Sequence, residues 1–213
     1  MPAIATPTLE HVQRQIGEVA DAQPRVIVLH GYGATPEGIV GVLDDWAGPG
    51  LALAPRGPLT SGPGHSWFAL SRDAGGFNQL GPGIVAAADR VASWMRDQGV
   101  SEAEPAVVTG FSQGGMLTFA LATQHPELVL VAVPMGGMLP LDLVPTGAPP
   151  ANAPPIVALH GADDGRVPTA LARDAVAALE KAGWKASIEE FAGVGHGVSP
   201  PMRARLYTLT GQR

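Results

Sequence analysis

The sequence contains no cysteine, so disulfide bonds, thiolate zinc sites and a cysteine nucleophile are all excluded. Lysine is nearly absent too, since the chain has only Lys181 and Lys185, and its arginines form no basic cluster. The formal net charge is −6, and because no basic cluster exists we expect neither a nucleic acid nor an anionic membrane surface as a partner. No stretch approaches the roughly 20 apolar residues that a membrane-spanning helix needs, so we expect no stable membrane insertion.

The first eight residues lack both a basic start and an apolar run, so we expect no signal peptide and a cytoplasmic protein. Glycine and proline are abundant, with 28 and 21 residues, and 46% of the chain is hydrophobic. This composition is typical of a compact globular protein with many tight turns, and it argues against disorder. At 213 residues the chain is short for two domains. We therefore predict a single domain over 1–213, with an N-terminal extension at 1–23 and the core at about 24–210.

Short apolar runs alternate with amphipathic segments along the chain, and this alternation predicts secondary structure. The runs that predict buried strands are 25–30, 51–54, 106–109, 128–133, 156–159 and 185–191. The segments that predict helices are 36–46, 84–98, 116–125, 169–182 and 200–209. Residues 8–20 have helical spacing but are equally compatible with an edge strand or irregular structure, and 59–83 and 134–155 show no regular pattern. Strands that alternate with helices predict an α/β fold with a mostly parallel central sheet flanked by helices.

The stretch 107–116 organises the chain, because an apolar run passes through Gly110-Phe111-Ser112-Gln113-Gly114 into a predicted helix. This Gly-x-Ser-x-Gly layout is typical of a nucleophile elbow, a sharp strand-to-helix turn with the serine at its apex. The two glycines fit, because strand and helix pack too closely there for larger side chains. The helix N-terminus would direct positive partial charge toward the group that Ser112 attacks.

A nucleophilic serine needs a base and an acid that orients the base, and in serine hydrolases of α/β type these follow in the order Ser, Asp or Glu, His. Two histidines, His160 and His196, follow the strand after the elbow. His196 lies in a glycine-rich loop before the last helix, so we predict that it is the base. His160 ends a strand and is predicted to be a structural hydrogen-bond partner. The acid is then Asp163 or Asp164, which follow the same strand.

The oxyanion of an acyl-transfer reaction needs main-chain donors, one after the serine and one after an early strand. Gln113 supplies the first of these N–H groups. The turn His30-Gly31-Tyr32-Gly33 supplies the second, which we assign to Tyr32. Tyr32 is equally well suited to form an aromatic wall of the substrate pocket.

The chain as a whole resembles the phospholipase/carboxylesterase group of α/β hydrolases, which includes acyl-protein thioesterases and small bacterial esterases. The resemblance covers residues from about 25 to 209 and depends on motifs that appear in the family's order: His30-Gly31-Tyr32-Gly33, Ala54-Pro55-Arg56-Gly57-Pro58, Ser66-Trp67-Phe68, Gly110-Phe111-Ser112-Gln113-Gly114-Gly115, His160-Gly161-x-x-Asp164-x-x-Val167-Pro168 and Gly195-His196. It implies an α/β-hydrolase fold without a large cap domain. It also implies that Asp164 is the acid, and that Arg56, Trp67 and Phe68 lie in loops that rim the acyl pocket.

These features together predict a serine hydrolase that cleaves carboxylic esters with short to medium acyl chains, using Ser112, His196 and Asp164. Its partner would be a small-molecule ester, and no metal or organic cofactor is implied. Thioester or lysophospholipid hydrolysis by the same residues is the first alternative, and a non-catalytic binding protein with the same fold is the second. An apolar rim around the site could serve either substrate entry or contact between the subunits of a homodimer.

Overall fold

The computed structural model describes residues 9–18, 24–70 and 80–211 of the chain. Seven strands form one sheet in the order β1-β3-β2-β6-β7-β8-β9. The bounds of these strands are β1 His11–Ile16, β2 Arg25–Leu29, β3 Gly50–Pro55, β6 Ala106–Phe111, β7 Val129–Met135, β8 Ile156–Gly161 and β9 Ala186–Phe191. Strand β1 is antiparallel to β3, and the other neighbouring strands pair in parallel.

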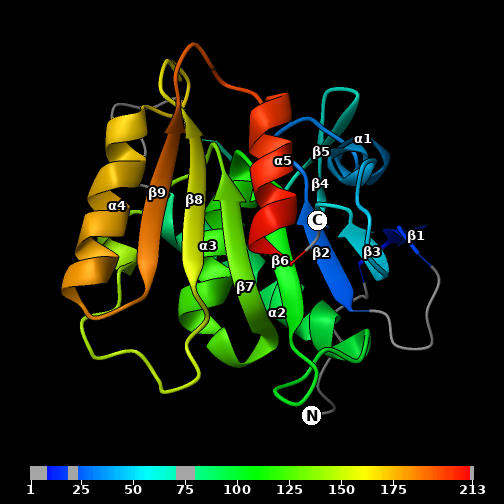
Figure 1. Ribbon diagram of the computed structural model, residues 1–213, viewed down its shortest axis with the longest axis horizontal. Coiled ribbons are helices and arrows are strands. Elements are labelled where there is room, and N and C mark those ends of the chain that lie inside the picture. The colour runs from blue at the N-terminus through cyan, green and yellow to red at the C-terminus, as the bar shows by residue number, and fades with distance from the viewer. Residues whose placement is uncertain (1–8, 19–23, 71–79, 212–213) are drawn as a thin grey trace.

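Helices cover both faces of this sheet (Figure 1). The bounds of the helices are α1 Pro36–Val40, α2 Gly81–Asp97, α3 Gln113–Gln124, α4 Thr169–Lys181 and α5 Pro200–Leu209. Side chains of α2, α3 and α4 share one buried cluster with the sheet, whereas those of α1 and α5 share a second cluster on the other face. The predicted α/β fold with a mostly parallel, helix-flanked sheet is confirmed.

The central strands are short apolar runs because each of them is buried on both faces. Val26, Ile27, Val28 and Leu29 of β2, for example, have no exposed surface. Residues 11–16 form an edge strand and not a helix, in antiparallel register with β3. Part of the segment predicted as an N-terminal extension therefore completes the sheet.

The helix predicted over 36–46 ends at Val40 and continues as a 3-10 turn from Gly41 to Leu43. The Arg14 guanidinium of β1 donates a hydrogen bond to the Val40 carbonyl at 2.9 Å. A long-range partner thus satisfies a carbonyl oxygen that the end of the helix leaves free.

The two segments without a predicted pattern contain short regular pieces. Strands β4 Leu59–Ser61 and β5 Gly64–Ser66 form an antiparallel hairpin, and residues 71–79 lie outside the described parts of the chain. A 3-10 turn at Leu141–Leu143 interrupts the segment 134–155. No helix in the described parts of the chain is both long enough and apolar enough to cross a membrane.

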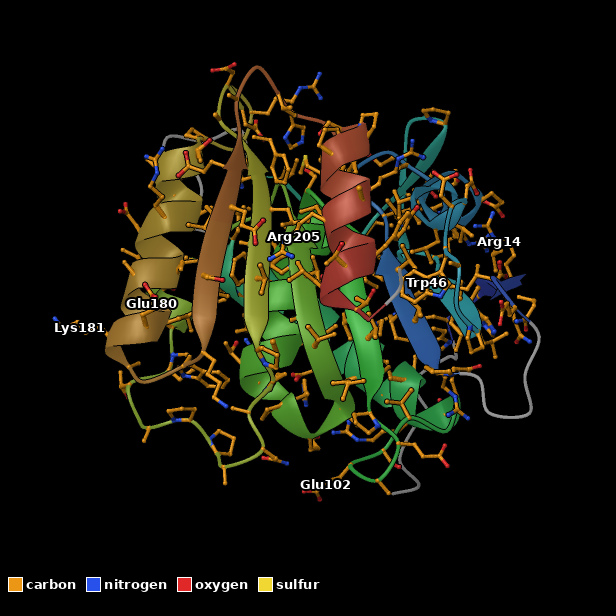
Figure 2. The ribbon with its side chains drawn as sticks, in the orientation of Figure 1. Arg14, Trp46, Glu102, Glu180, Lys181 and Arg205 are labelled. Atoms are coloured by element: carbon orange, nitrogen blue, oxygen red, sulfur yellow. The ribbon has the colours of Figure 1, made fainter. Side chains whose placement is uncertain are left out.

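The parallel strands place the loops that follow β2, β6, β8 and β9 at one edge of the sheet, at the top of Figure 1. The last of these loops connects β9 to α5, and both of its ends are anchored. The Arg205 side chain of α5, which is labelled in Figure 2, binds the carboxylate of Glu189 on β9. The distances are 2.8 Å for Nε···Oε2 and 2.7 Å for Nη2···Oε1. At the start of α5, the Ser199 hydroxyl accepts the N–H of Met202.

Candidate active site

Ser112 lies at the apex of the turn between β6 and α3, with φ 56° and ψ −114°. It has the only positive φ among the non-glycine residues of the described segments. Such strained backbone concentrates at functional sites and persists only where the surroundings enforce it. Here packing enforces it, because a Cβ on Gly114 would lie 2.0 Å from the carbonyl oxygen of Leu29, and one on Gly110 would lie 2.6 Å from the carbonyl oxygen of Gly114. The residues that flank Ser112 in the motif must therefore be glycines.

His196 lies in the loop between β9 and α5, next to the serine. Its Nε2 atom is 3.0 Å from Ser112 Oγ, and its Nδ1 atom is 2.7 Å from Oδ2 of Asp164. The imidazole also packs against the Phe111 ring, with 4.7 Å between ring centroids. Because a carboxylate only accepts hydrogen bonds, the proton of the neutral imidazole belongs on Nδ1, and Nε2 is left to accept the serine hydroxyl.

Asp164 is buried, and both of its carboxylate oxygens have partners. Oδ2 faces His196, whereas Oδ1 accepts the N–H groups of Arg166 at 2.9 Å and Val167 at 3.0 Å. Burial alone would raise the pKa of Asp164, but the hydrogen bonds from His196, Val167 and Arg166 outweigh burial and lower this pKa below its ordinary value. The carboxyl group is therefore ionised at neutral pH.

The neighbouring Asp163 is exposed, and its N–H donates to the carbonyl of Val194 at 2.9 Å. Its backbone thus ties the β8 loop to the loop that carries His196. His160 is fully buried, with Nε2 2.9 Å from the carbonyl oxygen of Val167, and this bond closes the turn around Asp164. Of the two adjacent acids, the structure brings only Asp164 to His196.

The loop after β2 passes directly beside the serine. A Cβ on Gly31 would lie 3.4 Å from the Cβ of Ser112, so the two turns are in contact. The fully buried His30 holds this loop, because its Nδ1–H donates to the carbonyl of Gly31 at 2.8 Å and its Nε2 accepts the N–H of Gly57 at 3.0 Å. Burial lowers the pKa of His30, which keeps the ring neutral, as an accepting Nε2 requires.

Trp67 and Phe68 connect this loop to the elbow. Trp67 stacks on His30, and its Nε1–H donates to the His30 carbonyl at 2.8 Å. The buried Gln113 side chain accepts the N–H of Trp67 at 3.0 Å and donates to the carbonyl of Phe68 at 2.9 Å. Sequence reasoning did not predict this network, although two adjacent aromatic residues in a glycine-rich loop are a signal of local burial.

The three residues expected at the rim of the pocket have other surroundings in the structure. Trp67 and Phe68 are 3% and 4% exposed and belong to the hydrophobic core. Arg56 forms an ion pair with Glu10, at the edge of the sheet where β1 meets β3. None of the three is among the described residues that line the cavity at Ser112. The local sequence shows that these residues are bulky or charged, but it does not show the direction in which each one points.

A cavity of about 630 Å³ opens beside Ser112 and His196. The other residues of the described chain that line it are Gly31, Tyr32, Ala34, Leu70, Phe111, Gln113, Met116, Gly165, Arg166 and Val167. Two of them form an exposed apolar rim, since Tyr32 is 53% and Leu70 is 42% exposed. Within the described segments, no group of three or more potential ligand side chains is arranged to hold a metal ion. The site is thus a largely apolar cavity with Ser112 and His196 in its wall and Asp164 bonded to the histidine outside that wall.

Comparisons with known proteins show the family to which the chain belongs. The profile of the family described as Phospholipase/Carboxylesterase matches residues 15–208. A probable carboxylesterase of Oryza sativa subsp. japonica is 30% identical over 177 residues, which are 78% of this chain and 64% of that protein. The chain thus spans less than two thirds of the length of this curated relative.

Solved structures extend the likeness to three dimensions. Esterase PE8 matches with a TM-score of 0.79 and 21% identity, over 97% of this chain and 100% of that one. Acyl-protein thioesterase 2 of Zea mays matches with a TM-score of 0.71 and 20% identity, over 94% and 98% of the two chains. At these identities the likeness shows the fold alone. Because the family profile covers nearly the whole chain, the protein belongs to the phospholipase/carboxylesterase family.

Proposed function

We propose that the protein is a serine hydrolase that cleaves carboxylic esters through an acyl-serine intermediate. The observation that carries the proposal is the continuous chain of hydrogen bonds from Ser112 Oγ through both nitrogens of His196 to Asp164. In the first step Oγ attacks the ester carbonyl while Nε2 takes its proton. The imidazolium then returns this proton to the leaving alkoxide, and Asp164 stabilises the positive charge. Water activated by His196 next hydrolyses the acyl-serine.

The proposed mechanism also needs main-chain N–H groups that stabilise the negative charge on the carbonyl oxygen. Gln113 is the first residue of α3, so helix geometry leaves its N–H without a partner in the helix. Tyr32 follows Gly31 in the loop after β2. Because Gly31 lies against Ser112, the N–H of Tyr32 is also close to the elbow. We assign the N–H groups of Gln113 and Tyr32 as the oxyanion donors, and one such donor typically contributes about 10²–10³-fold in rate.

Thioester hydrolysis is the second candidate, because the structure resembles an acyl-protein thioesterase as well as an esterase. The same attack and proton transfer would operate, with a thiolate as the leaving group. The cavity of about 630 Å³ suits a short to medium acyl chain in either case. Initial rates on 4-nitrophenyl esters and acyl thioesters of matched chain length separate the two candidates.

A fluorophosphonate probe, which labels activated serines, tests the proposal directly. The native protein should be labelled, and Ser112→Ala should not. Ser187→Ala is the matched control, because Ser187 is an exposed serine of β9 and does not line the cavity. The proposal is wrong if the native protein resists the probe under conditions in which it cleaves esters, or if Ser112→Ala is labelled as strongly as native protein.

A further inference from the structure

Arg166 lines the cavity together with Ser112 and His196. Among the described residues of the cavity wall, it is the only one with a permanent charge. The remaining wall is formed by glycines, apolar side chains and the uncharged polar groups of Tyr32 and Gln113. Arg166 is exposed to solvent, so a substrate that enters the cavity would displace water from its guanidinium, and this desolvation is costly unless an anion of the substrate pairs with it.

The protein supplies such an anion to most of its other arginines. Seven of them lie within 4.0 Å of a carboxylate, namely Arg14, Arg25, Arg56, Arg96, Arg173, Arg203 and Arg205. In the part of the chain that the structure describes, Arg166 and Arg90 have no carboxylate partner at that distance. Arg90 lies in α2 and is not part of the cavity wall. Among the described residues, Arg166 thus combines a guanidinium without a carboxylate partner with a place in the cavity wall beside Ser112.

The position of Arg166 relative to the serine is fixed through its backbone. Its N–H donates to Oδ1 of Asp164, whose Oδ2 faces His196, which in turn contacts Ser112. The preceding Gly165 has open space around it, since a Cβ there would meet no atom within 4 Å. The main chain at Arg166 is therefore held by the acid of the site, and the residue itself is exposed to solvent.

We propose that Arg166 binds an ionised carboxylate of the substrate, so that the protein favours esters that carry such a group over neutral esters of the same size. This inference rests on the proposed function, because it names the substrate class of the same site. Arginine suits the role, since its planar fork can donate two parallel hydrogen bonds to a carboxylate. A local cation would also offset the repulsion that the net charge of −6 exerts on an approaching anion.

The test compares kcat/KM for charged and neutral esters in native protein and variants. Monoethyl adipate carries a carboxylate on the acyl side, O-pentanoyl glycolate carries one on the alcohol side, and ethyl pentanoate is the neutral reference. For at least one charged ester, Arg166→Gln should lower the ratio of charged to neutral kcat/KM by roughly 10- to 100-fold, the range for a hydrogen bond between charged groups. Arg166→Lys should restore part of the ratio, because a charge remains but the fork is lost.

Arg90→Gln is the matched control, because it removes the other arginine without a carboxylate partner in the described chain and should leave the ratio unchanged. The ratio in native protein should also fall as salt is raised, since the site is open to solvent. The inference is refuted if Arg166→Gln leaves the ratio of charged to neutral kcat/KM unchanged, or raises it, for both charged esters. The proposed function would still stand in that case, provided that cleavage of ethyl pentanoate depends on Ser112. A native protein that cleaves none of the three esters refutes the proposed function instead.

Discussion

Replacing Asp164 by asparagine should nearly abolish turnover while leaving the fold in place. The amide oxygen of the new side chain can still accept the N–H groups of Arg166 and Val167 that Oδ1 now accepts. The amide nitrogen, however, would donate toward His196 Nδ1, where Oδ2 now accepts at 2.7 Å. The imidazole would then carry its proton on Nε2, the atom that faces Ser112 at 3.0 Å, and could no longer accept the serine proton.

The expected loss is on the order of 10⁴ in kcat, because a carboxylate-to-amide change that fixes the wrong tautomer has this effect in serine proteases. A loss of this size corresponds to about 5.4 kcal/mol of transition-state stabilisation. The free energy of unfolding should change far less, by under about 2 kcal/mol. The hydrogen bonds that a neutral amide oxygen accepts are weaker than those of the carboxylate, and the removal of a buried charge offsets part of this loss.

Asp163→Asn is the control for this experiment, because it makes the same chemical change one residue away on an exposed side chain. We expect its kcat to remain within about threefold of native protein, since exposed substitutions away from a site have small effects. The assay is kcat and KM on a 4-nitrophenyl ester, with urea unfolding of each variant to verify the fold. The assignment of Asp164 fails if Asp163→Asn shows the greater loss, or if Asp164→Asn retains more than about a tenth of native turnover.

Two further predictions concern the supports of the site. Trp67→Phe keeps an aromatic ring stacked on His30 but removes the 2.8 Å hydrogen bond from the indole N–H to the His30 carbonyl. The free energy of unfolding should therefore fall by about 1–3 kcal/mol. The variant's kcat should fall by a larger factor than its KM changes. An unchanged urea midpoint would contradict this reasoning. Gly114→Ala should lower the free energy of unfolding by about 3 kcal/mol or more, because the new Cβ would lie 2.0 Å from the carbonyl oxygen of Leu29. Gly197→Ala is the control, because its Cβ would meet no atom within 4 Å. Thermal unfolding should show a change of no more than about 0.5 kcal/mol for this control. Equal melting temperatures for these two variants would show that the elbow is not close-packed.

The nucleophile elbow could be predicted from local sequence because its requirements are local. A sharp turn at Ser112 needs a preceding buried strand, a following helix and small residues at Gly110 and Gly114, and all of these are readable in ten consecutive positions. His196 could be predicted for a different reason. Parallel strands bring their following loops to one edge of the sheet, so chain order alone left few histidines to choose from.

The choice between Asp163 and Asp164 could not be made from the residues without a family likeness. Both acids follow β8 at nearly the same place, and only the path of the turn decides which side chain points inward. That path depends on His160 bonding to the Val167 carbonyl and on Arg166 and Val167 donating back to Oδ1. These bonds join residues across the turn, and composition does not reveal them.

The positions of Trp67 and Phe68 also could not be predicted from the sequence. The residues were expected at the pocket rim, whereas the structure buries both in the core and uses their backbone to hold Gln113. The sequence by itself determined the order of the elements, the elbow and the histidine that faces it, because these follow from periodicity and chain order. Only the tertiary structure decided how the turn after β8 directs Asp164 to His196, and which aromatic groups and which arginine line the cavity at Ser112, because side-chain direction is set by packing between segments that are far apart in the chain.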